Sequence, residues 1–204
     1  MSQPKIFSPE FFPHTMYTVF SESSFEDART KMNPKLRCPE SELPLLVTRY
    51  QYPLQDNPVL AVRKAIAERG FMKKDELRII AQWKAPRSAG HIEKNPEAYV
   101  REITGFSFSA TTERARIEVL TNLDGVRWPT ASVILHFFHK EPYPILDFRA
   151  LWSVSLDVPA QYSFEFWWPY VDFCRKLSRR VNMDMRTLDQ ALWQYSKENQ
   201  WDAK

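Results

Sequence analysis

The sequence predicts an all-α protein, and two observations support this. Apolar residues recur three or four positions apart from Asn57 onward, as Val59, Val62 and Ile66 do, which is the spacing of one helix face. Runs of alternating apolar and polar residues, which would indicate strands, are sparse. We therefore expect a helical protein of about nine helices.

The first strong helix is predicted to begin at Asn57 as its N-cap, with Pro58 at the first helical position. Gly70 is expected to end it, because glycine readily adopts the left-handed conformation of a helix C-terminus. A second helix follows over residues 74–84, where apolar positions again share one face.

A third helix is expected to start at Asn95, with Pro96 at the first helical position, and to close at Gly105. Thr111 or Thr112 then starts a helix that runs into a tight turn near Gly125.

Four more helices are predicted in the second half of the chain. They span 129–139, 147–156 and 163–180, and the last begins at Asp184 as its N-cap.

Residues 1–55 are irregular by composition, because seven prolines interrupt any long element. A short helix is possible at 24–31, and residues 43–52 read as a short strand or extended piece.

Length and composition narrow the classes of protein. The 204 residues suffice for one large domain or two small ones, and the net charge of +3 is not by itself typical of a nucleic-acid binder. Cys38 and Cys174 are too few for a disulfide framework or a four-cysteine metal site. The chain shows neither a targeting segment nor a membrane span, so we expect a cytoplasmic protein with no membrane partner.

Basic residues are concentrated in two stretches. Residues 63–101 carry ten Lys or Arg against five Asp or Glu, and residues 172–187 carry five against two. Such stretches are either part of a binding surface or, equally often, ordinary solvated helix faces.

Two short segments contain the most informative pattern. Residues 123–135 read LDGVRWPTASVIL and residues 143–149 read YPILDFR. The pattern predicts a helix, a tight hairpin, a second helix and then a lone carboxylate, Asp147, on a short extended segment. Asp147 lies 22 residues after Gly125.

These segments resemble the helix-hairpin-helix signature of the base-excision DNA glycosylases, in particular the endonuclease III-like branch. In that family a Leu-x-Gly-Val-Gly hairpin grips the DNA backbone and an aspartate acts on an extruded base. The resemblance covers roughly residues 111–152 and implies two helical subdomains flanking a cleft. Residues 57–140 would bear the hairpin, while 1–56 would pack with 141–204, whose aspartate lies at the cleft.

The predicted hairpin is suited to phosphate. A helix N-terminus presents unpaired amides and the positive end of the helix dipole, and Gly125 permits a close approach. Arg127 stands where the family usually has a second glycine, and it could add a phosphate contact of its own. The alternative is an ordinary helix–helix turn. The predicted DNA-contacting residues are Gly125, Val126, Arg127, Trp128, Thr130, Lys84, Arg87 and Arg149.

By resemblance, Asp147 is the catalytic residue. Cleavage of an N-glycosidic bond builds positive charge on the sugar, which a carboxylate stabilises, and the same carboxylate can orient a water. The alternative is that Asp147 simply N-caps the helix that follows it, and the two roles are compatible.

The lyase-competent branch of the family has a lysine four residues beyond the first hairpin glycine, which attacks the sugar as an amine. Pro129 occupies that position here, so we expect water as the nucleophile and no lyase step. The four-cysteine iron–sulfur loop of that branch is also absent, and no cofactor is expected.

A flipped base needs aromatic stacking partners. The pocket candidates are Trp83, Tyr143, Trp152, Trp167 and Trp168, although for each residue taken singly core packing is the more common role. Lys84 and Arg87 could contact phosphate or complement a helix C-terminus. His91, His136 and His139 lack the spacing of a metal site, so no metal is expected.

The sequence thus predicts a monofunctional DNA N-glycosylase that acts on double-stranded DNA as a monomer. The main alternative is a helix-hairpin-helix DNA-binding module without catalysis, which Arg127 and the modest charge favour. A protein-interaction domain is a third class.

Overall fold

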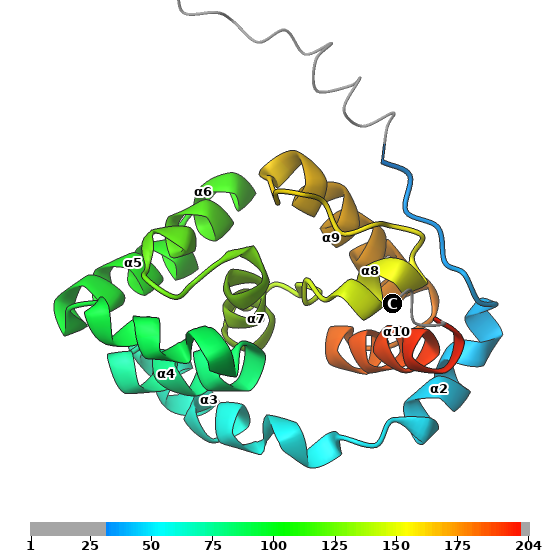
Figure 1. Cartoon of the computed structure of the whole chain (residues 1–204), viewed down its shortest axis with the longest axis horizontal. Coiled ribbons are helices and arrows are strands. Elements are labelled where there is room, and N and C mark those ends of the chain that lie inside the picture. The colour runs from blue at the N-terminus through cyan, green and yellow to red at the C-terminus, as the bar shows by residue number, and fades with distance from the viewer. Residues whose placement is uncertain (1–31, 201–204) are drawn as a thin grey trace, which may run out of the picture.

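The computed structural model describes residues 32–200, and this part of the chain is helical throughout, without strands (Figure 1). The all-α prediction is confirmed. The possible helix at 24–31 lies outside the described residues. The α-helices are α2 (Leu43–Arg49), α3 (Asn57–Arg69), α4 (Lys74–Lys84), α5 (Glu97–Ser109), α6 (Glu113–Glu118), α7 (Trp128–Phe138), α8 (Phe148–Ser153), α9 (Phe164–Arg180) and α10 (Met185–Asn199). Four 3₁₀ segments join them: η1 (Glu40–Glu42), η2 (Pro53–Asp56), η3 (Pro86–Lys94) and η4 (Val119–Asn122).

The helices form two groups, which lie side by side in Figure 1. Helices α3 to α7 pack on one another with η3 and η4, and we call them the hairpin lobe. Helices α2, α8 and α9 pack on α10 and form the C-terminal lobe. Two stretches of chain cross between the lobes, residues 50–56 (the strap) and residues 139–147 (the return segment).

Side-chain caps fix where several helices begin. Thr112, Ser163, Asp184 and Asp147 each accept a hydrogen bond from a backbone amide of the first turn that follows. Gly70 ends α3 in the left-handed conformation with φ 76°. These five boundaries agree with those expected from the sequence.

Several expectations about local structure are wrong, among them that Asn57 caps α3, whose N-cap is Asp56. Residues 43–49 form helix α2 and not a strand, because Pro44 sits in the first turn, where proline is tolerated, and Leu43 and Leu46 are buried. Gly105 does not close α5, which continues to Ser109. Gly105 lies where α5 passes the turn that follows α3, and a Cβ on Gly105 would be 3.6 Å from Cβ of Phe71.

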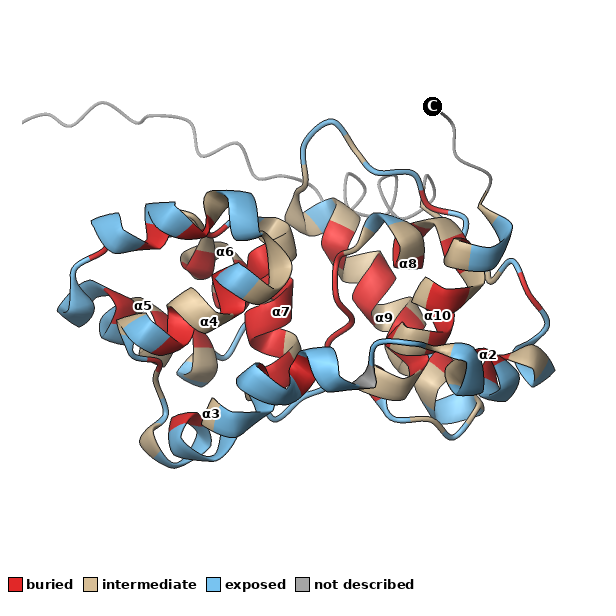
Figure 2. Cartoon of the chain, turned by 60° about the horizontal axis from the view of Figure 1, so that its bottom comes forward, coloured by how far each residue is buried: buried red, intermediate tan, exposed pale blue. Residues whose placement is uncertain are grey.

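Helix α7 is the centre of the hairpin lobe. Every residue from Thr130 to Leu135 is buried, and α7 packs against α3, α4 and α6. Figure 2 shows buried residues on the inward faces of both lobes and along the return segment. Residues 143–146 of the return segment are therefore part of the interior, whereas 140–142 are exposed.

Candidate functional site

The return segment runs back along α7. Near the C-terminal end of α7, Nδ1 of His136 lies 2.6 Å from the carbonyl oxygen of Tyr143. One turn earlier in the helix, Oγ of Ser132 accepts a hydrogen bond from the amide of Leu146 at 2.8 Å. The segment is therefore antiparallel to α7, and it carries Asp147 back toward the helix end where the hairpin lies.

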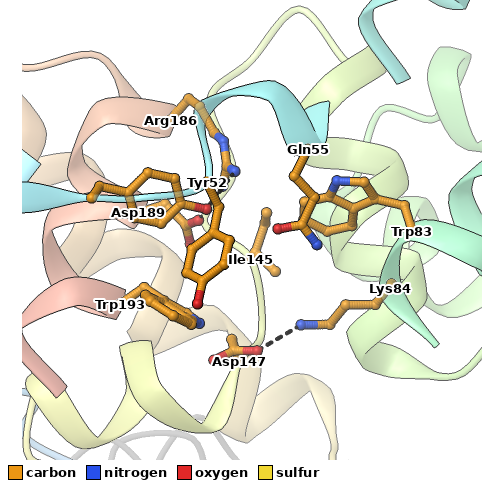
Figure 3. A pocket seen from close by; sticks show the side chains of 10 residues that line it. Tyr52, Gln55, Trp83, Lys84, Ile145, Asp147, Arg186, Asp189 and Trp193 are labelled. Atoms are coloured by element: carbon orange, nitrogen blue, oxygen red, sulfur yellow. Dashed lines mark hydrogen bonds and ion pairs between the residues drawn. The ribbon is translucent and has the colours of Figure 1, made fainter. Parts of the chain in front are cut away.

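Asp147 is both a helix cap and an accessible carboxylate. Its Oδ1 accepts the amide of Arg149 at 3.0 Å, which caps α8, and its Oδ2 lies 2.9 Å from Nζ of Lys84. The Lys84 side chain is 13% exposed and that of Asp147 is 23% exposed. Lys84 is the last residue of α4, in the hairpin lobe, and Asp147 precedes α8, in the C-terminal lobe. The ion pair therefore joins the two lobes (Figure 3).

The ion pair faces a cavity of about 320 Å³ between the lobes, which is within the size range of small-molecule sites, roughly 300–1,000 Å³. Figure 3 shows Trp83 and Lys84 entering from the hairpin lobe, with Asp189 and Trp193 opposite them. The lining residues are Tyr50, Tyr52, Gln55, Trp83, Lys84, Ile145, Asp147, Arg186, Asp189 and Trp193.

Three of the lining aromatics form one wall. The rings of Tyr50, Tyr52 and Trp193 meet edge to face, with centroid separations of 5.4 to 5.8 Å. Such contacts hold flat apolar surfaces in fixed orientations. Gln55, on the strap, directs its amide group toward the same space (Figure 3).

Buried charges connect the strap to α10. The guanidinium of Arg186 binds both carboxylate oxygens of Asp56, at 2.7 and 2.8 Å, and donates to Oδ2 of Asp189 at 2.6 Å. Burial, together with the nearby carboxylate of Asp147, raises the pKa of Asp189 to about 6, although Arg186 opposes this shift. The pocket therefore contains two carboxylates in different environments.

The hairpin has the backbone geometry expected from the sequence. Gly125 has φ 80°, and a Cβ there would lie 3.0 Å from Cδ1 of Ile92 and 3.2 Å from its backbone nitrogen. Only glycine fits this position without strain. The amide of Val126 is bonded to the carbonyl of Leu123, so the amides in the first turn of α7 are the ones left for a ligand.

Asn95 holds the hairpin in place. Its side chain donates to the carbonyl of Asp124 and accepts the amide of Asp124, both at 2.9 Å. It was expected to cap the next helix, but Pro96 is at that position and α5 begins at Glu97. The carboxamide of Asn95 thus ties the end of η3 to the hairpin.

The other predicted hairpin contacts differ in exposure. Arg127 is exposed and precedes α7, whereas Trp128 is half-buried with its ring 6.2 Å from that of Trp167. Val126 and Thr130 are buried, and the Val126 amide already donates to Leu123, so of these two residues only Thr130 could offer an amide to a phosphate.

The two remaining predicted cations lie apart from the hairpin in sequence. Arg87 is exposed on η3. Arg149 is half-buried, with its guanidinium 5.3 Å from the Trp193 ring, which places it beside the pocket wall. Lys84, by contrast, is a pocket residue paired with Asp147 and not a surface cation.

Of the five predicted pocket aromatics, Trp83 lines the cavity. Tyr143 and Trp167 are core residues, fully buried and stacked on each other at 5.6 Å. The hydroxyl of Tyr143 is bound to Glu113 and Arg116 in a network between α6 and the return segment. The positions of Tyr143 and Trp167 in the sequence do not show whether their rings pack in the core or line a pocket.

Trp152 and Trp168 also lie away from the cavity. Trp152 is covered by Arg37, whose guanidinium is 4.5 Å from its ring centroid. Trp168 stacks on Phe164 at 6.1 Å along α9. Both are half-buried structural residues.

The residues that the sequence did not reveal come from the strap and α10. Arg186, Asp189 and Trp193 follow one another three and four positions apart, so they share one face of α10. The sequence carries one signal for them: in the helix that begins after Asp184, these charged and aromatic residues share a face next to an apolar face. Tyr50, Tyr52 and Gln55 lie within residues 1–55, where the prolines predict irregular structure and no pattern marks a site.

Ion pairs neutralise part of the charge of the two basic stretches. In residues 63–101 the partners are five carboxylates of the same stretch and Asp147, so the net positive charge stays close to the sequence count. In residues 172–187 the partners Glu113, Glu40 and Asp56 come from outside the stretch and reduce its net charge. The pairs are Lys64–Glu68, Arg69–Glu76, Lys74–Glu93, Arg78–Asp75, Arg101–Glu97, Arg175–Glu113, Lys176–Asp172, Arg180–Glu40 and Arg186–Asp56.

Within residues 32–200, no group of three or more His, Cys, Asp or Glu is placed to hold a metal ion. None of the helices in this range combines the length and the apolar character that a membrane crossing requires. Comparisons with protein-family models, curated proteins and solved structures find no match to this chain.

Proposed function

We propose that the protein is a monofunctional DNA N-glycosylase that excises a modified or mismatched base from double-stranded DNA. The observation that carries the proposal is the position of Asp147: its carboxylate lines a cavity walled by aromatic rings, between two lobes. The helix-hairpin-helix resemblance of the same residues supports it independently.

The pocket has the parts that base excision requires. A base extruded from the duplex would stack against Trp83 or the wall of Tyr50, Tyr52 and Trp193. Asp147 would stabilise the positive charge that develops on the sugar and orient the attacking water. Lys84 would have to move from its position against Asp147 as the sugar enters, because the two side chains are in contact.

The hairpin would hold the DNA. Amides in the first turn of α7 would bind one phosphate, and Arg127 and Arg149 would add positive charge. Such contacts position a duplex without reading its sequence, so binding should be salt-dependent and insensitive to sequence. One copy of the chain would bind one duplex.

A DNA-binding module without catalysis is the second candidate. It is favoured by the Lys84–Asp147 ion pair, which neutralises the carboxylate that the chemistry needs, and by the modest net charge of +3. The two candidates differ in whether base release occurs.

The test is a screen of duplex oligonucleotides, each carrying one modified or mismatched base, with the purified protein in excess. We expect release of at least one base by the wild-type protein and its loss in Asp147→Asn. Duplex binding without release of any base by the wild-type protein would support the non-catalytic module instead.

A further inference from the structure

We infer that Asp189 is the acid that protonates the leaving base, and that the pocket is therefore built for a neutral base. The inference rests on the proposed glycosylase function and names a second catalytic residue and a substrate class for it. It is based on the placement of two carboxylates around one cavity.

The two carboxylates reach the cavity from different elements. Asp147 enters at the start of α8, at the sugar-facing position that the proposed chemistry assigns to it, and is paired with Lys84. Asp189 enters from the middle of α10, on the side of the cavity where Trp193 also lies (Figure 3). Its side chain is 8% exposed, so it contacts the cavity while bulk water is largely excluded.

Asp189 shares its cation with a second carboxylate, although a backbone hydrogen bond from Ile145 also favours its ionised form. Its Oδ2 accepts from Arg186 at 2.6 Å, and the same guanidinium is already bound by both oxygens of Asp56. One cation thus serves two carboxylates. With Lys84 and Asp147 forming the other pair, the cluster has two cations and three carboxylates.

A surplus carboxylate in a buried cluster favours protonation of the member that is held least by the cations, and Asp189 accepts one hydrogen bond from Arg186 where Asp56 accepts two. Burial raises the pKa of Asp189 to about 6, whereas ordinary aspartates titrate near 3.8. Hydrolases of glycosidic bonds commonly use two carboxyl groups in different environments. One donates a proton to the leaving group, and the other is ionised and stabilises positive charge on the sugar. The ionisable groups that face Asp189 are Arg186, Asp56, Asp147, Lys84, Tyr50, Tyr170 and Cys174.

The step balances as a hydrolysis. As the bond between the sugar C1′ and the base nitrogen breaks, its electron pair stays with the base, and the Asp189 carboxyl gives its proton to a base nitrogen. Water attacks C1′ and Asp147 accepts the proton of that water. Both carboxyl groups then return to their starting states by proton exchange with solvent, and the products are a free neutral base and an abasic sugar.

The substrate class follows from this chemistry. A neutral base is a poor leaving group until it is protonated, so it gains from an acid in the pocket. A base that already carries a positive charge, such as 7-methylguanine, leaves as a neutral molecule without receiving a proton.

The test compares Asp189→Asn with Asp56→Asn. Asp56 binds the same Arg186 and is equally buried, but it does not line the cavity, so it controls for loss of the ion-pair cluster. Probes are duplexes with a single uracil, hypoxanthine or 8-oxoguanine, which are neutral, and one with 7-methylguanine. Single-turnover release is measured from pH 5 to 8, with the melting temperature of each variant.

We expect the wild-type protein to release a neutral base at a rate that falls as the pH rises above about 6. Asp189→Asn should lower that rate by roughly 100-fold or more and remove this pH dependence, as expected for loss of a general acid. Asp56→Asn should still show a pH dependence, with its midpoint moved to lower pH because Arg186 then serves Asp189 alone, and Asp189→Glu should recover part of the rate. Any release of 7-methylguanine should change little in Asp189→Asn.

Three results would overturn the inference. They are release of 7-methylguanine alone by the wild-type protein, equal losses in Asp189→Asn and Asp56→Asn, or an unchanged pH profile in Asp189→Asn. In each of these the glycosylase proposal survives, because bases are still released. Absence of release of every probe, in the screen above as well, would remove both proposals.

Discussion

At the scale of single residues, Asp147 and Lys84 form the most consequential contact of the pocket. The pair joins the end of α4 to the start of α8 at 2.9 Å, with both side chains largely buried. Pro129, at the position where the lyase branch of the resembled family has its lysine, lies in the first turn of α7 and has no amine. Lys84 is the amine that the structure places in the cavity instead.

We predict that Lys84 does not attack the sugar. Its ammonium is paired with Asp147, and a protonated amine is not a nucleophile. Base release should leave an abasic strand that breaks only on treatment with alkali, and borohydride should trap no covalent complex. A trapped adduct that disappears in Lys84→Gln would show that Lys84 is a lyase nucleophile.

At the scale of elements, the hairpin depends on one backbone conformation and one side chain. Gly125 has positive φ and packs against Ile92, and Asn95 fixes Asp124 by two hydrogen bonds. The cost of a side chain at Gly125 therefore has two parts, the backbone conformation and the contact with η3.

The chain contains a matched control for this position. Gly70 has nearly the same φ, 76° against 80°, but a Cβ there would meet nothing within 4 Å. We predict that Gly125→Ala and Gly70→Ala each lose about 1–2 kcal/mol of stability from the left-handed conformation. Only Gly125→Ala should weaken duplex binding, measured by anisotropy at two salt concentrations.

Equal duplex affinity in Gly125→Ala and Gly70→Ala would remove the hairpin from the binding surface. A loss in Gly125→Ala that is the same at both salt concentrations would argue against phosphate as its ligand, because phosphate contacts weaken as salt rises.

The elements that the sequence predicted well are those with local signals. Asp147, Ser163 and Asp184 cap their helices through side-chain hydrogen bonds that depend only on nearby residues. The strap and Asp189 could not be found in this way. The role of Asp189 depends on Asp56, which is 133 residues away in the sequence and binds the same guanidinium.

At the scale of the whole molecule, the lobes are joined by buried charge as well as by the chain. Arg186 and its two aspartates tie the strap to α10, and a raised proton affinity at Asp189 is the consequence of that burial. Because burial raises the pKa of Asp189 in the folded protein, the free energy of unfolding depends on pH in a defined direction.

We predict opposite pH dependences for Asp189, within α10, and Asp184, which caps the same helix. The folded-state pKa of Asp189, about 6, is above the usual 3.8, so its contribution to stability is full below pH 3.8 and is lost as the pH rises through 6. Relative to Asp189→Asn, the wild-type protein should lose roughly 2–3 kcal/mol between pH 4 and 7, measured by urea unfolding.

Asp184 provides the comparison. Burial raises its pKa, but hydrogen bonds from Thr187 and Arg186 outweigh this and lower it, so its contribution is present above pH 3.8 and is lost as the pH falls. Asp184→Asn should therefore differ most from the wild-type protein at neutral pH. A constant difference between the wild-type protein and Asp189→Asn across the range would show that Asp189 titrates normally.

The central claim is that the Asp147 carboxylate performs chemistry in the pocket between the lobes. The most direct measurement is single-turnover base release by Asp147→Asn on whichever lesion duplex the wild-type protein cleaves, with duplex affinity and melting temperature measured in parallel. Asparagine caps a helix about as well as aspartate but leaves the Lys84 ammonium without a charged partner, so the melting temperature should fall modestly and duplex binding should be retained, while the rate should fall on the order of 100-fold or more. A variant that releases the base at the wild-type rate but melts at a much lower temperature would contradict the claim and leave Asp147 as a structural cap.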